Sequence, residues 1–192
     1  DNGSVENYPW AVSITEKGKN KLGGVIISPL HILTAAHPFV RFIGLQVCPC
    51  QSRGYRSFDE LQNRSVAYGG KCIRGRMPDL PNHPLCEVSD MQVNKIRSVV
   101  VDSDFVMSSC TDGHDWAIVE LERPLIFTNK GDSGSGMQQK DENGTAILIG
   151  ITSFGTKGCP PNELARFTRV DRYLYEICVI TGVCYSLNYT VY

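Results

Sequence analysis

The chain has 192 residues and a mass of 21.3 kDa, enough for one large domain or two small lobes with a core. Apolar residues make up 42% of it, which excludes a disordered chain, and a formal net charge of −1 excludes a strongly basic nucleic-acid binder. No apolar run approaches the roughly 20 residues that a membrane helix needs. From the charge and the apolar pattern together, we expect neither nucleic acid nor membrane as a partner.

Short strands separated by turn residues dominate the pattern. Residues 10–15 and 22–28 flank a polar loop at residues 18–20 and predict a hairpin, and residues 138–141 and 145–152 predict a second one around Glu142-Asn143-Gly144. The remaining predicted strands cover residues 32–35, 41–47, 91–101, 116–122 and 164–170. Many short strands favour an all-β barrel or sandwich.

One helix is predicted, close to the C-terminal end. Asp171 can cap it, Tyr173, Leu174 and Ile177 have helical spacing, and Gly182 can end it. Residues 48–90 differ from the rest, because they hold four cysteines and several prolines with little periodicity. We interpret them as a disulfide-tied loop insertion.

Eight cysteines and four Asn-x-Ser/Thr sequons, at Asn2, Asn63, Asn143 and Asn188, point to an oxidising compartment. We therefore expect a secreted, extracellular glycoprotein; a reduced intracellular protein is the alternative. Without an initiating Met or a signal peptide, the sequence is expected to be a mature chain or a fragment. Cys48, Cys50, His83 and Cys86 allow a zinc cluster as an alternative to disulfides, which the irregular spacing disfavours.

Three segments carry residues suited to acyl transfer. LTAAH ends at His37 just after an apolar strand, HDWAIVEL places Asp115 at the start of another, and GDSGSG places Ser133 in a glycine-rich bend. A nucleophile, a base and a carboxylate that orients the base are what this chemistry needs, with backbone N–H groups to hold the oxyanion. Each segment alone also has a structural interpretation, as a turn, a strand end or a cap, and His31, His83 and His114 are interpreted as structural.

In this order, and with their flanking segments, the three motifs resemble those of the trypsin/chymotrypsin-fold serine proteases, peptidase family S1. Residues 8–12, 23–28, 152–155 and 168–170 resemble strands of that family. The resemblance implies a double Greek-key β-barrel with a C-terminal helix, and a disulfide-rich insertion in the first barrel resembles divergent invertebrate members. It implies one peptidase domain over residues 1–192, divided into a first barrel (1–127), a remnant of a second barrel (128–170) and a helix (171–184).

The resemblance also implies an activity and a site. The expected function is a secreted serine endopeptidase without cofactor or metal, with proteins or peptides as substrates and protein inhibitors as further partners. Ser133 is the expected nucleophile, His37 the general base and Asp115 the carboxylate that orients it. The remaining implied residues are Gly131 with Ser133 for the oxyanion hole, Ser153, Phe154 and Gly155 for substrate binding, and Ala165 at the back of the specificity pocket.

The spacing departs from the family. His37 and Asp115 are 78 positions apart, against roughly 45 in the chymotrypsin triad, and Asp115 and Ser133 are 18 apart, against roughly 90. The second barrel is therefore expected to be truncated. The floor of the specificity pocket falls in the shortened stretch, so the preferred substrate side chain is not predicted. No Ile-Val pair starts the chain to provide the amine that usually pairs with the residue at Asp132. The alternatives are an inactive homologue acting as a binding or regulatory module, and an incomplete splice or gene-model form of an active protease.

The cysteine pattern departs from the family as well. Leu22 and Pro38 stand where the bridge beside the catalytic His is expected, and Asn129 stands where the usual partner of Cys159 is expected. Five cysteines lie in residues 48–110 and three in residues 159–184, so complete internal pairing needs at least one bridge between the two groups. Cys178 with Cys184 is a plausible local bridge, which leaves Cys159 as the crossing candidate; the full pairing stays open.

Overall fold

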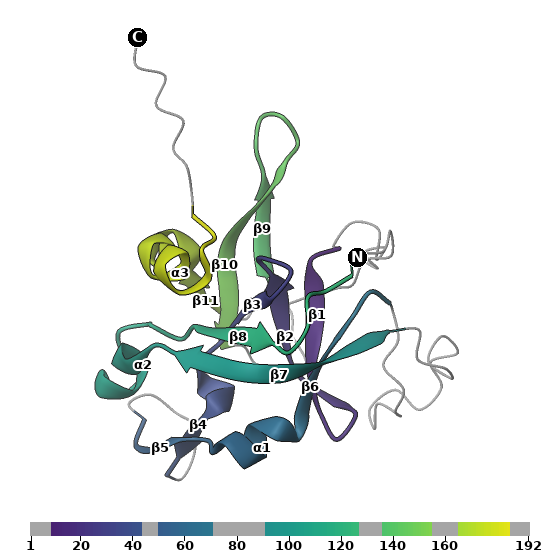
Figure 1. Cartoon of the computed structure of the whole chain (residues 1–192). Helices are drawn as coiled ribbons and strands as arrows, with labels where there is room; N and C mark the ends of the chain where they lie inside the picture. The colour runs from purple at the N-terminus through teal and green to yellow at the C-terminus, as the bar shows by residue number, and fades with distance from the viewer. Residues whose placement is uncertain (1–8, 44–49, 71–90, 127–135, 155–164, 185–192) are drawn as a thin grey trace, which may run out of the picture.

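The computed structural model describes residues 9–43, 50–70, 91–126, 136–154 and 165–184 (Figure 1). Strands predominate, and the helices are few and short. In chain order the elements are β1 (Ala11–Glu16), β2 (Lys19–Ile26), β3 (His31–Thr34), η2 (His37–Phe39), β4 (Val40–Phe42), β5 (Ser52–Tyr55), α1 (Phe58–Gln62), β6 (Arg64–Tyr68), β7 (Gln92–Val101), α2 (Ser103–Met107), β8 (Ala117–Leu121), β9 (Gly136–Lys140), β10 (Ala146–Phe154), β11 (Arg166–Arg169), η3 (Val170–Arg172) and α3 (Leu174–Thr181).

Six antiparallel strands close into a barrel in the order β1-β2-β3-β8-β7-β6, and β6 pairs back onto β1. The first hairpin turns at Lys17 and Gly18, which both have positive φ (52° and 74°). Two residues with positive φ match the twist that a two-residue hairpin needs, so β2 begins nearer the turn than the sequence predicted. The all-β barrel fold predicted from the sequence is confirmed.

Strands β3 and β8 are buried on both faces. Ile32 and Val119 point into the barrel core, whereas Leu33 and Ile118 point into a second core outside the barrel. Side chains alternate between the two faces of a strand, so a strand between two cores is apolar at successive positions. This explains why the segment from Ala117 to Val119 is continuously apolar and buried.

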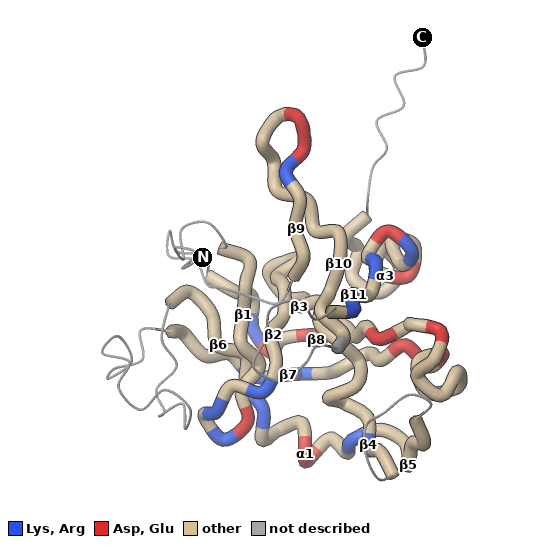
Figure 2. Tube along the Cα trace, turned by 180° about the vertical axis from the view of Figure 1, so that it is seen from behind, with Lys and Arg blue, Asp and Glu red and all other residues tan. Residues whose placement is uncertain are grey.

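The second core lies between the barrel and the C-terminal part of the chain. That part is a three-stranded sheet in the order β11-β10-β9, followed by α3 (Figures 1 and 2). Ile151 of β10 and Ile177 of α3 meet Trp116 in this core. A Cβ atom at Gly136 would lie 2.5 Å from Val25, so β9 packs closely against β2 at this glycine. The described residues thus form a closed barrel and a smaller, open sheet.

Three predictions about local structure were wrong. The predicted single helix is one of them, because α1 and α2 form as well. The interpretation of residues 48–90 as a loop insertion fails for β6, which is a barrel strand with Val66 and Ala67 buried. β6 is short and begins with the buried Arg64, so it lacks a clean period-2 pattern. Asp171 does not cap α3. It lies in η3, where its carboxylate pairs with Arg169 at the end of β11, and Tyr173 is the N-cap residue of α3 instead.

Two disulfides are described. Cys178–Cys184 confirms the predicted local bridge, and Cys50–Cys110 links the segment just before β5 to the loop that precedes β8. Cys50 is therefore bonded to sulfur and is not a zinc ligand as in the alternative interpretation. Cys48, Cys72, Cys86 and Cys159 lie outside the described residues, and so do the predictions made for them.

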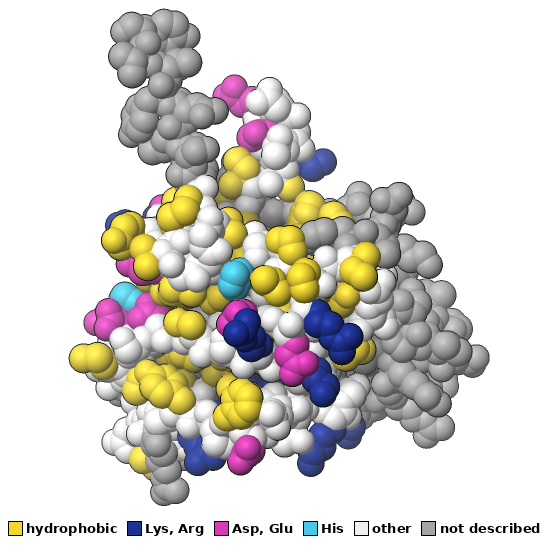
Figure 3. Space-filling view, viewed as in Figure 1, with side chains coloured by type: hydrophobic (Ala, Val, Ile, Leu, Met, Phe, Trp, Pro, Cys, Tyr) yellow, Lys and Arg dark blue, Asp and Glu magenta, His cyan; other side chains and the backbone are white. Residues whose placement is uncertain are grey.

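The surface carries charges of both signs. Figure 3 shows Lys and Arg side chains close to acidic ones over the front of the barrel. Arg97 of β7 pairs with Glu120 of β8 at 3.2 Å. Tyr175 and Val179 on the outer side of α3 are 78% and 66% exposed. Among the helices described, none combines the length and the apolar character needed to cross a membrane.

Candidate active site

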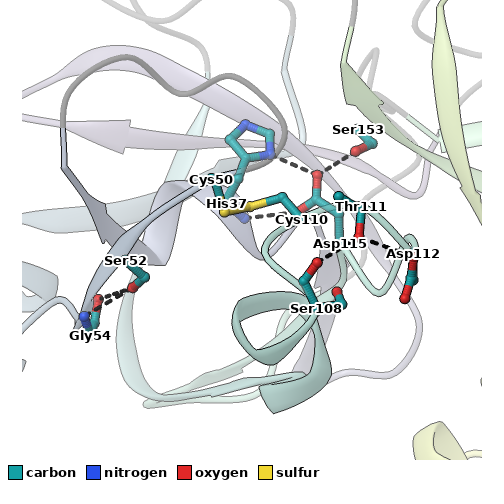
Figure 4. Close-up of a disulfide and its surroundings, with 10 residues drawn as sticks. All are labelled: His37, Cys50, Ser52, Gly54, Ser108, Cys110, Thr111, Asp112, Asp115 and Ser153. Atoms are coloured by element: carbon teal, nitrogen blue, oxygen red, sulfur yellow. Dashed lines mark hydrogen bonds and ion pairs between the residues drawn. A yellow bond between two sulfur atoms is a disulfide. The ribbon is translucent and has the colours of Figure 1, made fainter.

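The pairing of β3 with β8 brings His37 and Asp115 together from positions 78 residues apart. Thr34 at the end of β3 lies opposite Ala117 at the start of β8. His37 follows Thr34 by three residues and Asp115 precedes Ala117 by two, so both reach the same end of the barrel. In Figure 4 the imidazole of His37 points toward the carboxylate of Asp115, and Nδ1 lies 2.9 Å from Oδ2.

Asp115 is 1% exposed and accepts four hydrogen bonds. Its Oδ1 accepts from the backbone N–H groups of Ala36 and His37, each at 2.8 Å, and its Oδ2 accepts from His37 Nδ1 and from the hydroxyl of Ser153 at 2.5 Å. Burying an ionised carboxylate without partners is strongly unfavourable, and charge-assisted hydrogen bonds offset that cost. All four neighbours are donors, so the site fits a carboxylate and no neutral amide.

The hydrogen bond to Asp115 fixes the tautomer and the orientation of His37. A carboxylate oxygen only accepts, so Nδ1 carries a proton and Nε2 is the ring nitrogen directed away from Asp115. The side chain of His37 is 23% exposed, whereas that of Asp115 is 2% exposed. The imidazole therefore has one edge bound in the protein interior and the other edge toward the surface, as a general base requires.

Ser153 holds Asp115 from the opposite side of the carboxylate. It lies near the end of β10, in the sheet outside the barrel, and its hydroxyl points at Oδ2 in Figure 4. The sequence motif gave Ser153 a substrate-binding role only. The contact with Asp115 joins residues 38 positions apart, and no local pattern reveals such a pair.

An open cleft of about 380 Å³ lies beside Asp115, and His37 is not among the residues that line it. Asp115 and Ser153 lie on its wall together with Thr168 and Tyr173 of the C-terminal part, and Thr111 comes from the loop after α2. The cleft lies where the barrel meets the smaller sheet.

The structure describes only some of the other predicted site residues. Ser133, Gly131 and Gly155 lie outside the described residues, and with them the predicted nucleophile and oxyanion hole. Phe154 is the last residue of β10, with its backbone opposite Arg166 of β11. Ala165 is exposed and directly precedes β11.

His114, next to Asp115, forms a second pair of the same type. Its Nδ1 lies 2.8 Å from Oδ2 of Asp102, whose Oδ1 accepts from the backbone N–H of Asp104 and caps α2. Ligand atoms of Asp102, Asp104 and His114 lie within 4.8 Å of one another, a spacing that a metal ion can bridge. The direct contacts already satisfy Asp102 and His114, which agrees with a structural role for this histidine.

Comparison with known proteins finds two partial similarities. A family model described as Trypsin matches residues 125–177, the segment that contains the GDSGSG motif and Ser153. The chain is also 27% identical over 138 residues to the trypsin-like protease try-5 of Caenorhabditis elegans. Both matches support the resemblance to trypsin-like serine proteases that the motifs carry.

This trypsin-like chain matches only part of its relative. The alignment covers 61% of the chain and 39% of the length of the nematode protein. The activity of the complete nematode protein is therefore not assigned to this chain.

Proposed function

We propose that the chain is a secreted serine endopeptidase that hydrolyses peptide bonds through an acyl-enzyme on Ser133. The observation that carries the proposal is the His37–Asp115 pair, in which four hydrogen bonds hold the buried carboxylate of Asp115. The match of residues 125–177 to the Trypsin family model supports the same activity. Protein or peptide substrates follow from this reaction.

In the proposed reaction, Oγ of Ser133 attacks the carbonyl carbon of the peptide bond while Nε2 of His37 takes the hydroxyl proton. The C–N bond then breaks and His37 returns the proton to the leaving amine. Water attacks the acyl-enzyme in the same way, releasing the acid and restoring Ser133. Asp115 keeps Nδ1 protonated and stabilises the imidazolium that forms in each half.

The N–H groups of Gly131 and Ser133 are the proposed oxyanion hole, and the end of β10 is the proposed edge for substrate pairing. Ser153 reaches Asp115 from that strand, so the same strand would place the substrate backbone beside the catalytic pair. Extended peptides add to exposed strand edges through main-chain hydrogen bonds. Phe154 and Gly155 would continue this edge, and Ala165 would lie behind it.

Ser133→Ala tests the proposal directly. We expect the wild-type chain to hydrolyse an unfolded protein substrate and the variant to lose that activity by a factor on the order of 10⁶, as for other nucleophile deletions in serine proteases. The measurement is release of new amino termini over time by purified protein. Equal turnover by the two proteins would contradict the proposal. Absence of hydrolysis by both, in folded protein, would favour a non-catalytic binding or regulatory module.

Secretion and glycosylation belong to the same proposal and have their own test. Asn63 at the end of α1 and Asn143 in the β9–β10 turn are exposed sequon residues. We expect enzymatic deglycosylation of the secreted chain to lower its mass, and Asn63→Gln and Asn143→Gln each to remove one glycan. Asn20→Gln, at an exposed asparagine outside any sequon, is the control. Unchanged mobility of the wild type after deglycosylation would contradict this part.

A further inference from the structure

We propose that Thr168 and Tyr173 are positioning residues for the His37–Asp115 pair, because their hydroxyl groups fix the backbone at and next to Asp115. The proposal rests on the proposed function for its catalytic consequence. The C-terminal sheet would then do more than supply the edge for substrate pairing. Together with Tyr173, which precedes α3, it would also hold the Asp115 carboxylate in position.

The backbone around Asp115 needs such support because it lies outside the strand ladder. β8 begins only at Ala117, and the two residues before Asp115 have positive φ, 88° at Gly113 and 61° at His114. A non-glycine residue in the left-handed region persists only where its surroundings fix it. The segment that aims the carboxylate is therefore held by contacts from elsewhere in the chain.

Thr168 provides one of these contacts. Its hydroxyl donates to the backbone carbonyl of Asp115 at 3.0 Å, and the residue is 7% exposed. Thr168 lies on β11 opposite Ile151 of β10, two residues before Ser153. Neighbouring strands of one sheet thus hold the same residue twice: Ser153 binds the side-chain carboxylate of Asp115, and Thr168 binds its main chain.

Tyr173 provides the other contact. Its hydroxyl accepts from the backbone N–H of His114 at 3.2 Å, and its ring packs against His114 and Trp116 with centroid distances of 5.5 Å and 5.3 Å. Burial raises the pKa of Tyr173, and the nearby carboxylate of Asp102 adds to the increase. The phenol therefore stays neutral at physiological pH, and α3, which begins after Tyr173, is tied to the residues on both sides of Asp115.

Losing either hydroxyl should shift the carboxylate rather than remove it. Small displacements of positioned groups reduce turnover strongly, up to about 100-fold for 1 Å. For Thr168→Val we expect kcat to fall by about 10- to 100-fold with KM changed by less than about threefold, and for Tyr173→Phe a fall of about 10-fold. Thr168→Ser keeps the hydroxyl and should restore kcat to within about threefold of wild type.

Thr15→Val is the matched control. Thr15 lies on β1, is 5% exposed, and its hydroxyl donates to the backbone carbonyl of Ser65 on β6, so it resembles Thr168 in burial and in the kind of contact. It is in the first hairpin and is not among the residues that line the cleft beside Asp115. We expect kcat of this variant to stay within about twofold of wild type.

A spectroscopic readout separates this proposal from the proposed function. In Ser133→Ala protein, which needs no activity, the His37 Nδ1 proton bound to Asp115 should give a downfield proton NMR signal, assigned by its loss in His37→Gln. We expect Thr168→Val to shift or broaden this signal, and Thr168→Ser and Thr15→Val to preserve it. An unchanged signal and unchanged kcat in folded Thr168→Val and Tyr173→Phe would overturn the proposal. If the signal depends on Thr168 but the unsubstituted chain hydrolyses nothing, the positioning stands and the peptidase function fails.

Discussion

Asp115→Asn is expected to reduce kcat by about 10⁴-fold, the size of effect known for the equivalent change in a trypsin-like triad. Both carboxylate oxygens of Asp115 accept from two donors each, from backbone N–H groups on one side and from His37 and Ser153 on the other. An asparagine must turn its NH₂ group toward one of these sets. The backbone donors cannot change, so the NH₂ group faces His37 and makes Nδ1 an acceptor. The proton then sits on Nε2, where a general base cannot take another.

Asp112→Asn is the control for this change. Asp112 lies three residues earlier, is exposed, and accepts only from the Thr111 hydroxyl among its described contacts. The substitution removes the same charge near the same cleft but leaves the contacts of Asp115 intact. We therefore expect kcat of this variant to stay within about twofold of wild type. Steady-state kinetics on a peptide substrate measure both variants. A similar loss in the two would mean that charge near the cleft, rather than the tautomer of His37, limits turnover.

Removing the Cys50–Cys110 disulfide is expected to lower the free energy of unfolding by about 4 kcal/mol. The bridge joins residues 60 positions apart, and the entropy of closing a loop of this length in the unfolded chain gives that magnitude. Both cysteines are buried, and Cys50 N–H also donates to the carbonyl of Ser109 at 2.7 Å. Urea unfolding of Cys50→Ser/Cys110→Ser, followed by Trp116 fluorescence, measures the loss.

The Cys178–Cys184 bridge offers the comparison. It joins residues only six positions apart at the end of α3, and the same relation gives about 2 kcal/mol for Cys178→Ser/Cys184→Ser. The first double variant should also lose catalytic turnover, because Cys110 lies five residues before Asp115 in the loop that aims it. Equal destabilisation by the two pairs would show that loop length does not set their contributions.

Strand positions could be predicted where turn residues and apolar runs mark them. The hairpins follow from turn residues, and β3 and β8 follow from short, continuous apolar runs, within a few residues at each end. β6 was missed because it lies in a cysteine-rich segment and starts at Arg64. α1 was missed as well, although Ser57 and Glu60 form a capping box that the sequence displays as Ser-x-x-Glu.

The pair at the centre of the site was predictable, and its support was not. His37 and Asp115 stand in motifs, and the structure brings them together. Thr168 and Tyr173 reach the Asp115 segment across 53 and 59 positions, through hydroxyl contacts that no spacing rule encodes. The role of Ser133 as nucleophile stays a prediction, because that residue lies outside the described part of the chain.

The most direct test of the account is covalent labelling of the secreted, deglycosylated chain by a fluorophosphonate beside Ser133→Ala. An activated serine attacks the phosphorus and displaces fluoride, so labelling requires Ser133, His37 and the oxyanion hole to assemble together. The account predicts a labelled band near 21.3 kDa that is absent in the variant. A folded wild-type chain of that mass without label, or a band that survives Ser133→Ala, would contradict it.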